Sequence, residues 1–310
     1  TLNKARVPEM AGYVLDNPND YVFSALTVSI DSEVNFTPID GQDKLGVLEV
    51  PMEARFIIND GQHRRASIIE ALDQRPELAY ETIAVVFFLD IGLERCQQMF
   101  ADLNRYAIRP SRSIGILYDH RNEKAKLAKL VIMQSEVFRD IVDMEKSSLA
   151  KRSRKLFTLS AFYNACADLI LDLAKGELVA DADLARNYWE AVAEQFPVWT
   201  QVRDGKMLSS EVRESYIHSH GIALQALSKV GNALMKKYPK NWKKPLEKLS
   251  KIDWSRGNAK LWEGRAMVGG RISKTSNNVT LTINALKSAL GLPLEEEEQR
   301  IEEAYKKGKL

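Results

Sequence analysis

The sequence has 310 residues, of which 45% are hydrophobic and 28% are charged, which is enough for a sizeable core and predicts two structural parts. Its net charge of +2 is too small to indicate a nucleic-acid partner by itself, so such a partner has to be argued from local patches. The two cysteines lie in apolar helical patterns, which is typical of buried thiols in a reducing compartment, and we expect a cytoplasmic protein. No apolar run approaches the roughly 20 residues of a membrane helix and no signal-peptide pattern is recognised, so we expect no membrane segment.

Apolar periodicity predicts a mixed α and β first part. Residues 7–15 predict a short helix with a proline in its first turn, and strands are predicted over residues 21–30, 46–50 and 55–59. Residues 83–89 are apolar at every position, which favours a strand that lies centrally in its sheet with both faces covered. A helix with an apolar stripe through Cys96 and Phe100 follows, and residues 114–133 predict one long helix.

The segment of greatest interest is residues 59–65, between a predicted strand and a helix that begins near Ala66, with Gly61 at the turn. A strand that turns into a helix leaves free backbone N–H groups at the helix start, and these groups attract anions. Arg64 and Arg65 add cations that can bind phosphate through paired hydrogen bonds, although cations at a helix N-terminus oppose the helix dipole. Two arginines in this unfavourable position indicate a bound anion that offsets the loss of helix stability they cause.

Two other side chains of this segment suit the same site. Asp60 can hold a metal ion or a water, and His63 titrates near neutral pH. The alternative interpretation is that Asp60 only caps the helix and that the arginines only form a solvated first turn.

A second polar segment, residues 102–113, follows the helix after the apolar strand. Asp102 and Asn104 can position a metal ion or a water, and Arg105, like two later arginines of the segment, can meet phosphates. Ser113 ends the segment as a capping residue. The alternative is a capped loop between two helices with solvated arginines.

Residues 146–155 break the periodicity with a concentration of positive charge and hydroxyl groups. Such cations bind DNA phosphates without reading the sequence, and they make binding depend steeply on salt. The candidate DNA-binding residues of this segment are Lys146, Lys151, Arg152, Arg154 and Lys155. The alternative is a basic linker, and in either case the segment marks a boundary between two parts.

Beyond residue 157 the pattern is almost wholly helical, and one of the predicted helices runs over residues 211–238. His218 and His220 stand two apart on this helix and do not share a face, so we expect no zinc site there. Trp254 and Trp262 stand among glycines and cations in a stretch that either contacts nucleic acid or forms an irregular loop with its tryptophans buried.

Residues 60–64 spell Asp-Gly-Gln-His-Arg, the signature of the DGQHR-domain proteins. With four further segments in the same order, the chain resembles the DndB family, the DGQHR-domain proteins of bacterial DNA phosphorothioation systems. The four segments are residues 99–105, 117–121, 155–160 and 262–267. The resemblance therefore covers nearly the whole chain.

The DGQHR domain is in turn similar to the ParB and sulfiredoxin fold, whose members hold a nucleoside triphosphate at the same strand-to-helix turn. The resemblance implies an α+β fold class, with a ParB-like α/β domain and a small mixed sheet over residues 1–142, a basic linker over 143–156 and a helical domain over 157–310. CTP specificity and sulfinic-acid reduction do not carry over, because this chain has Gln62 and His63 in the signature and lacks the sulfiredoxin cysteine.

The resemblance also implies a regulatory, DNA-binding protein that represses the modification genes at their promoter and is not needed for sulfur insertion itself. Related DGQHR proteins are linked to ATP hydrolysis, which agrees with an anion site at the motif. We therefore expect ATP and Mg²⁺ as ligands, with no zinc, haem or flavin. The expected partners are DNA and other phosphorothioation proteins, and self-association stays open, as does the question whether ATP is hydrolysed or only sensed.

Candidate site residues follow from these expectations. Nucleotide binding is assigned to Gly61, Gln62, His63, Arg64, Arg65, Asn104, Arg105 and Ser113. Asp60 and Asp102 are assigned to Mg²⁺ or a catalytic water, and His63 to proton transfer. Two alternatives remain, a metal-dependent DNA-nicking nuclease that uses Asp60 and His63, and a non-catalytic assembly protein in which the motif is only a structural cap.

Overall fold

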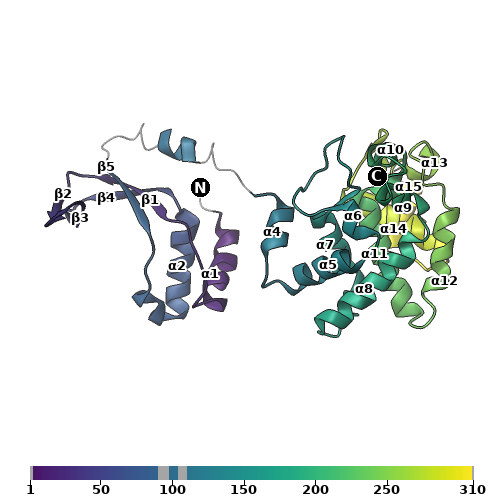
Figure 1. Cartoon of the computed structure of the whole chain (residues 1–310), viewed down its shortest axis with the longest axis horizontal. Helices are drawn as coiled ribbons and strands as arrows, with labels where there is room; N and C mark the ends of the chain where they lie inside the picture. Colours follow the sequence, from purple (N-terminus) through teal and green to yellow (C-terminus); the bar gives the residue numbers. More distant parts are fainter. Residues whose placement is uncertain (1–2, 90–97, 104–109, 309–310) are drawn as a thin grey trace. The chain divides into compact units, whose positions relative to one another are not determined.

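The computed structural model describes residues 3–89, 98–103 and 110–308, and the chain divides into two compact units, Thr1–Arg109 and Pro110–Leu310 (Figure 1). The first unit combines a small sheet with helices, and the second is mostly helical. The expected α+β fold class is confirmed. No helix in the described part of the chain is both long enough and apolar enough to cross a bilayer.

The N-terminal unit is built on a three-stranded sheet in the order β4-β1-β5, formed by β1 (Leu26–Asp31), β4 (Arg55–Asp60) and β5 (Val85–Leu89). β1 runs antiparallel to β4 and parallel to β5, and its first five residues are buried because it has a neighbour on each side. The expectation that residues 83–89 form a covered, central strand is wrong. β5 lies at an edge of the described sheet, and Phe88 and Leu89 are 38% and 58% exposed. An unbroken apolar run does not specify which strands become its neighbours.

Two helices and a hairpin accompany this sheet. The predicted first helix is present as α1 (Val7–Asp16), and it packs against α2 (Gln62–Gln74) through a small cluster of Ala11, Val14 and Ala71. Short 3₁₀ helices lie at Lys4–Arg6 and Pro76–Tyr80, and residues 98–103 are helical. β2 (Asn35–Ile39) and β3 (Gln42–Glu49) form a separate antiparallel pair. Only the end of β3 was expected as a strand, although Asp40 and Gly41, with φ of 76° at the glycine, are a recognised hairpin signal.

The second unit packs its helices around one large hydrophobic core. Phe138 lies at its centre, with ring centroids 4.8 Å from Phe162 and 5.9 Å from Trp189. The helices are α4 (Arg112–Tyr118), α5 (Glu123–Gln134), α6 (Phe138–Ile141), α7 (Leu159–Leu169), α8 (Leu178–Ala193), α9 (Pro197–Arg203), α10 (Ser209–Ser215), α11 (Gly221–Lys237), α12 (Lys243–Leu246), α13 (Ala259–Trp262), α14 (Ser276–Leu290) and α15 (Glu296–Lys306). The unit also contains short 3₁₀ helices at Ile217–Ser219 and Glu247–Lys251. It has two short strand pairs, β6 (Val142–Asp143) with β7 (Phe157–Thr158) and β8 (Met267–Val268) with β9 (Arg271–Ile272).

The division between the units lies earlier in the chain than the expected boundary at residue 142. Leu127 and Val131 of α5 belong to the same core as Phe162 and Trp189, so residues 110–142 join the helical unit. The segment 143–156, expected as a linker, lies inside this unit, because β6 and β7 pair at its two ends. Helical periodicity identified the helices correctly but does not say against which neighbours they pack.

Two helices expected to be continuous are interrupted. Between α4 and α5 the Asp119 carboxylate accepts hydrogen bonds from the N–H groups of Arg121 and Asn122, and the Asn122 side chain caps α5. Between α10 and α11 the Ser219 hydroxyl donates to the carbonyl groups of Val212 and Tyr216. In both places a short polar side chain competes for backbone groups and ends the helix.

Candidate functional site

The signature segment forms a strand–turn–helix, as the sequence predicts. β4 ends at Asp60, Gly61 is the residue before α2, and Gly61 has a left-handed backbone with φ of 103°. A Cβ atom on Gly61 would lie 2.4 Å from Cδ2 of Leu26 in β1, which is closer than side chains approach. Glycine is therefore required here both for the backbone angle and for the contact with β1.

Arg64 is bonded within the motif and to the segment that leads into β1. Its guanidinium donates hydrogen bonds to the Asp60 carboxylate at 2.5 Å, to the Ser24 hydroxyl at 2.6 Å and to the Ala25 carbonyl at 3.2 Å. The Arg64 side chain is only 16% exposed, and its Nε is buried without a partner. Arg64 was expected to bind phosphate directly, and in this structure it holds the turn against β1.

The start of α2 has no side-chain cap, because Asp60 accepts from Arg64 and does not reach the first turn. The interpretation of Asp60 as a helix cap is therefore wrong. The first N–H groups of α2 stay available, and they carry the positive end of the helix dipole. A metal ion at Asp60 would have to compete with the guanidinium of Arg64.

The remaining side chains of the motif differ in their availability. Gln62 donates to the carbonyl of Ile58 at 2.7 Å, and Nε2 of His63 accepts from the backbone N–H of Asn3 at 2.8 Å. Arg65 is exposed, and the described residues offer it no hydrogen bond or ion pair through its side chain. Arg65 is therefore the motif cation that is ready for an external anion.

The second polar segment is only partly described. Asp102 is exposed and accepts from Nε2 of Gln98 at 2.9 Å, whereas Asn104 and Arg105 lie outside the described residues. Ser113 is buried in the helical unit, where its hydroxyl donates to the carbonyl of Lys146 at 2.9 Å. The residue that caps α4 is Ser111, and Ser113 has a structural role.

The basic segment 146–155 is a shaped loop. The guanidinium of Arg213 donates to the carbonyl groups of Ala150 and Lys151, at 3.0 Å and 2.9 Å. Two of the five cations are engaged, since Lys151 pairs with Glu214 and Lys155 donates to the Asp140 carbonyl. The other three are exposed, and the described residues give their side chains no hydrogen bond or ion pair: Lys146, Arg152 and Arg154.

Comparison with known proteins places the chain. The model of the DndB family, described as DNA-sulfur modification-associated, matches residues 1–293. The chain belongs to the DndB family. No curated protein and no solved structure matches it. Membership confirms the expected link to DNA sulfur modification, and the likeness of the N-terminal unit to ParB stays a prediction.

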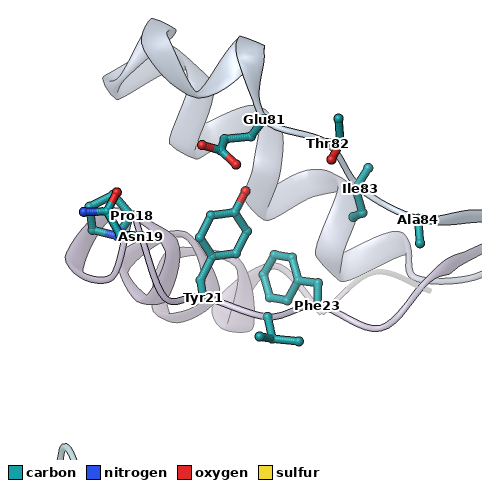
Figure 2. Close-up of a pocket in the computed structure, with 9 residues that line it drawn as sticks. Pro18, Asn19, Tyr21, Phe23, Glu81, Thr82, Ile83 and Ala84 are labelled. Carbon is teal, nitrogen blue, oxygen red and sulfur yellow. The ribbon is translucent and has the colours of Figure 1, made fainter.

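This DndB-family chain also has a pocket of about 410 Å³ that sequence reasoning missed (Figure 2). Tyr21, Phe23 and Glu81 line it, and Figure 2 shows the Tyr21 hydroxyl directed towards Glu81. Burial, and then the Glu81 charge, raise the pKa of Tyr21. The pocket is lined by no arginine or lysine and by no residue of the signature, so it offers no cationic side chain to a phosphate.

His218 and His220 of the helical unit are hydrogen-bonding groups, of which His218 is buried and His220 is half-buried. Nδ1 of His218 accepts from the indole N–H of Trp199 at 3.0 Å, and Nε2 of His220 donates to the Arg213 carbonyl at 2.8 Å. Among the described residues no group of three or more His, Cys, Asp or Glu side chains is arranged to hold a metal ion. Trp254 and Trp262 are also buried, which settles their stretch as a packed loop.

Proposed function

We propose that this DndB-family protein is a DNA-binding regulator of a DNA sulfur modification system, which represses the modification genes and binds a nucleoside triphosphate, ATP, at residues 60–65. The observation that carries the nucleotide site is the uncapped start of α2 beside the exposed Arg65. Free backbone N–H groups and the positive end of the helix dipole lie there, and the exposed Arg65 stands in the same first turn. Phosphates bind to this combination of groups.

Two arginines of the motif have different parts in this proposal. Arg64 is the positioning residue, because its bonds to Asp60 and Ser24 fix the angle between β1 and the turn. Arg65 contacts the phosphates, together with the N–H groups of Gln62 and His63. Hydrolysis would in addition need Asp60 or Asp102 to hold Mg²⁺ or a water, with His63 moving the proton and Asn104 and Arg105 closing the site.

The nucleotide site is tested by titrating labelled ATP, CTP and GTP against the wild-type protein and Arg65→Ala. We expect ATP to bind, and we expect Arg65→Ala to weaken it by about tenfold to a hundredfold, since a hydrogen bond to a charged group contributes about 1.5–3 kcal/mol. The matched control is Arg55→Ala. Arg55 is also exposed, and it lies at the opposite end of β4 from the motif, so its removal should leave ATP binding unchanged.

Equal affinity in the wild-type protein and Arg65→Ala would remove Arg65 from the site. Failure of the wild-type protein to bind any of the three nucleotides would remove the nucleotide from the proposal. ATP turnover by the same variants separates hydrolysis from binding, and His63→Ala tests the proton-transfer role.

DNA binding is assigned to the loop 146–155, in which Arg213 fixes the backbone and Lys146, Arg152 and Arg154 project into solvent. The regulatory part is tested by footprinting the promoter of the modification genes with the purified protein, with and without ATP. Protection of a defined site supports a repressor, and uniform protection along the fragment would contradict sequence-specific repression.

A second candidate function is the non-catalytic assembly protein. The observation in its favour is that Arg64 and Asp60 form an ion pair with each other, so that part of the signature has a structural role without any ligand. On this alternative, Arg64→Ala lowers the stability of the N-terminal unit, and Arg65→Ala has no effect on nucleotide or DNA binding.

A further inference from the structure

The two units differ strongly in charge. Residues 1–109 contain 10 Lys and Arg against 17 Asp and Glu, a net charge of −7, whereas residues 110–310 contain 34 against 25, a net charge of +9. These opposite charges nearly cancel, so the net charge of the whole chain is only +2. A polyanion is attracted to the helical unit and repelled by the N-terminal one.

Much of the positive charge of the helical unit lies outside the loop 146–155. Residues 236–251 hold seven lysines against the single acidic residue Glu247, a net charge of +6. All seven are exposed: Lys236, Lys237, Lys240, Lys243, Lys244, Lys248 and Lys251. We call these seven side chains the lysine surface.

The backbone beneath the lysine surface is fixed by packing. It comprises the end of α11, α12 (Figure 1) and the 3₁₀ helix Glu247–Lys251. Leu246 and Leu249 bury their side chains in the core. The Trp242 ring lies 5.8 Å from the ring of Tyr188. The apolar side of this stretch therefore faces the core, and the lysines are held on the side that faces solvent.

Carboxylates neutralise little of this charge. Among the described residues Lys236 alone of the seven forms an ion pair, with Asp172 at 3.2 Å. Lys236 and Lys237 also suit the C-terminal end of α11, where the helix dipole favours cations. The five lysines from 240 to 251 lie beyond that helix, so the dipole does not account for them.

We propose that the lysine surface binds the sugar-phosphate backbone of duplex DNA. Several exposed ammonium groups without a carboxylate partner, on one packed stretch of chain, suit the phosphates of a duplex. Lysine acts there as a point charge that makes sequence-independent contacts. A groove of about 570 Å³ adjoins the surface, and its lining includes Lys229, Lys236 and Lys237 as well as the carboxylates of Asp168 and Glu295. This surface is separate from the loop 146–155, which contacts α10.

The inference rests on the proposed function only in taking DNA as the partner. It is tested on the full chain with the variant Lys240→Gln/Lys243→Gln/Lys244→Gln/Lys248→Gln. A control variant with the same loss of charge is Lys124→Gln/Lys175→Gln/Lys206→Gln/Lys307→Gln, at four exposed lysines of the same unit. Thermal unfolding followed by tryptophan fluorescence establishes that both variants are folded.

The measurement is the affinity for a labelled mixed-sequence duplex of about 30 base pairs over a range of salt concentrations. Each phosphate contact contributes about 0.9 to the slope of log affinity against log salt, so we expect the slope to fall by about 3 to 4 in the lysine-surface variant. The control variant should keep a slope close to that of the wild-type protein.

An unchanged slope in the lysine-surface variant, with binding by the wild-type protein intact, would overturn this inference and leave the proposed function standing. Wild-type protein that binds no duplex at any salt concentration would overturn both. Binding of phosphatidylserine vesicles that is lost in the variant, while the duplex slope is kept, would assign the surface to a membrane and overturn the inference as well.

Discussion

Adjacent residues of one motif can have unlike roles, as Arg64 and Arg65 illustrate. Consecutive residues of a helix point about 100° apart, so one guanidinium turns towards β1 and the other towards solvent. Asp60 is the last residue of β4 and forms its ion pair with Arg64 across the turn at Gly61. This pair, like the bonds of Arg64 to Ser24 and Ala25, depends on the fold.

A pH dependence is expected from His218 and His220. Burial lowers the pKa of His218 to about 3 and that of His220 to about 4. Their pKa in the unfolded chain is about 6.5, so the unfolded state takes up these protons first as the pH falls. Stability should therefore be complete above about pH 6.5 and decrease towards about pH 4, by up to about 1.4 kcal/mol per pH unit for each histidine.

Urea unfolding over this pH range tests the prediction, because all five tryptophans lie in the helical unit and their fluorescence reports on it alone. His218→Gln should remove about one proton from the pH dependence. His120→Gln, at an exposed position, should leave the dependence as in the wild-type protein. A His218→Gln variant with the wild-type pH dependence would contradict this account.

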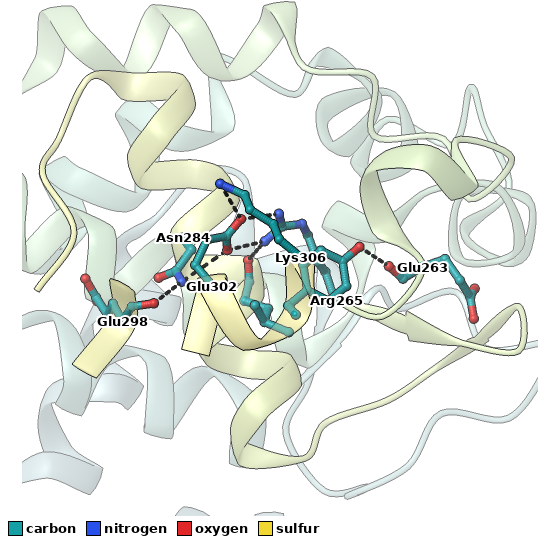
Figure 3. Close-up of polar contacts among 8 residues, drawn as sticks. Glu263, Arg265, Asn284, Glu298, Glu302 and Lys306 are labelled. Carbon is teal, nitrogen blue, oxygen red and sulfur yellow. Dashed lines mark hydrogen bonds and ion pairs between the residues drawn. The ribbon is translucent and has the colours of Figure 1, made fainter. Parts of the chain in front are cut away.

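At the scale of elements, one ion pair joins the loop before β8 to two helices (Figure 3). The Arg265 guanidinium donates to both oxygens of Glu302 in α15, at 2.8 Å and 2.7 Å, and to the Leu281 carbonyl in α14 at 2.8 Å. Both side chains are nearly buried, at 12% and 11% exposure. Arg265 holds the pKa of Glu302 below its usual value. The pair therefore contributes stability above the carboxyl's unfolded pKa, and this contribution is lost as the pH falls.

Removal of this pair should destabilise the helical unit strongly. Glu302→Gln leaves the Arg265 charge buried without its counter-ion, and we expect a loss of about 3 kcal/mol in the free energy of unfolding. Glu303→Gln is the matched control, because Glu303 is the next residue on the exposed side of α15, where its pair with Lys307 is worth little. Equal unfolding midpoints for the two variants would show that the buried pair is not important for stability.

At the scale of the whole molecule, the helical unit has a core of its own. The members of its hydrophobic cluster lie between Leu127 and Leu292, so no residue of the N-terminal unit belongs to it. We expect the fragment 110–310 to fold alone and to unfold cooperatively, within a few degrees of the tryptophan transition of the full chain. Far-ultraviolet circular dichroism and tryptophan fluorescence measure this. A fragment without a cooperative transition would show that the unit needs the first 109 residues.

The features that the sequence determined by itself are those that depend on near neighbours along the chain. They include α1, the strand–turn–helix at Gly61, the helical character of the second part and the burial of Cys166. The family signature belongs with them, since it links the chain to DNA sulfur modification before any contact is known. Each of these features results from a few residues at a fixed spacing along the chain.

Contacts between distant segments were decided only by the tertiary structure. It put β1 at the centre of the sheet instead of β5, gave residues 110–142 to the helical core, and turned Arg64 inwards while Arg65 stayed exposed. It also left seven lysines together on one packed stretch, beyond the basic segment that the sequence singled out. Hydrophobic burial is not directional, so an apolar or charged pattern specifies that a residue is buried or exposed and leaves its partners to the fold as a whole.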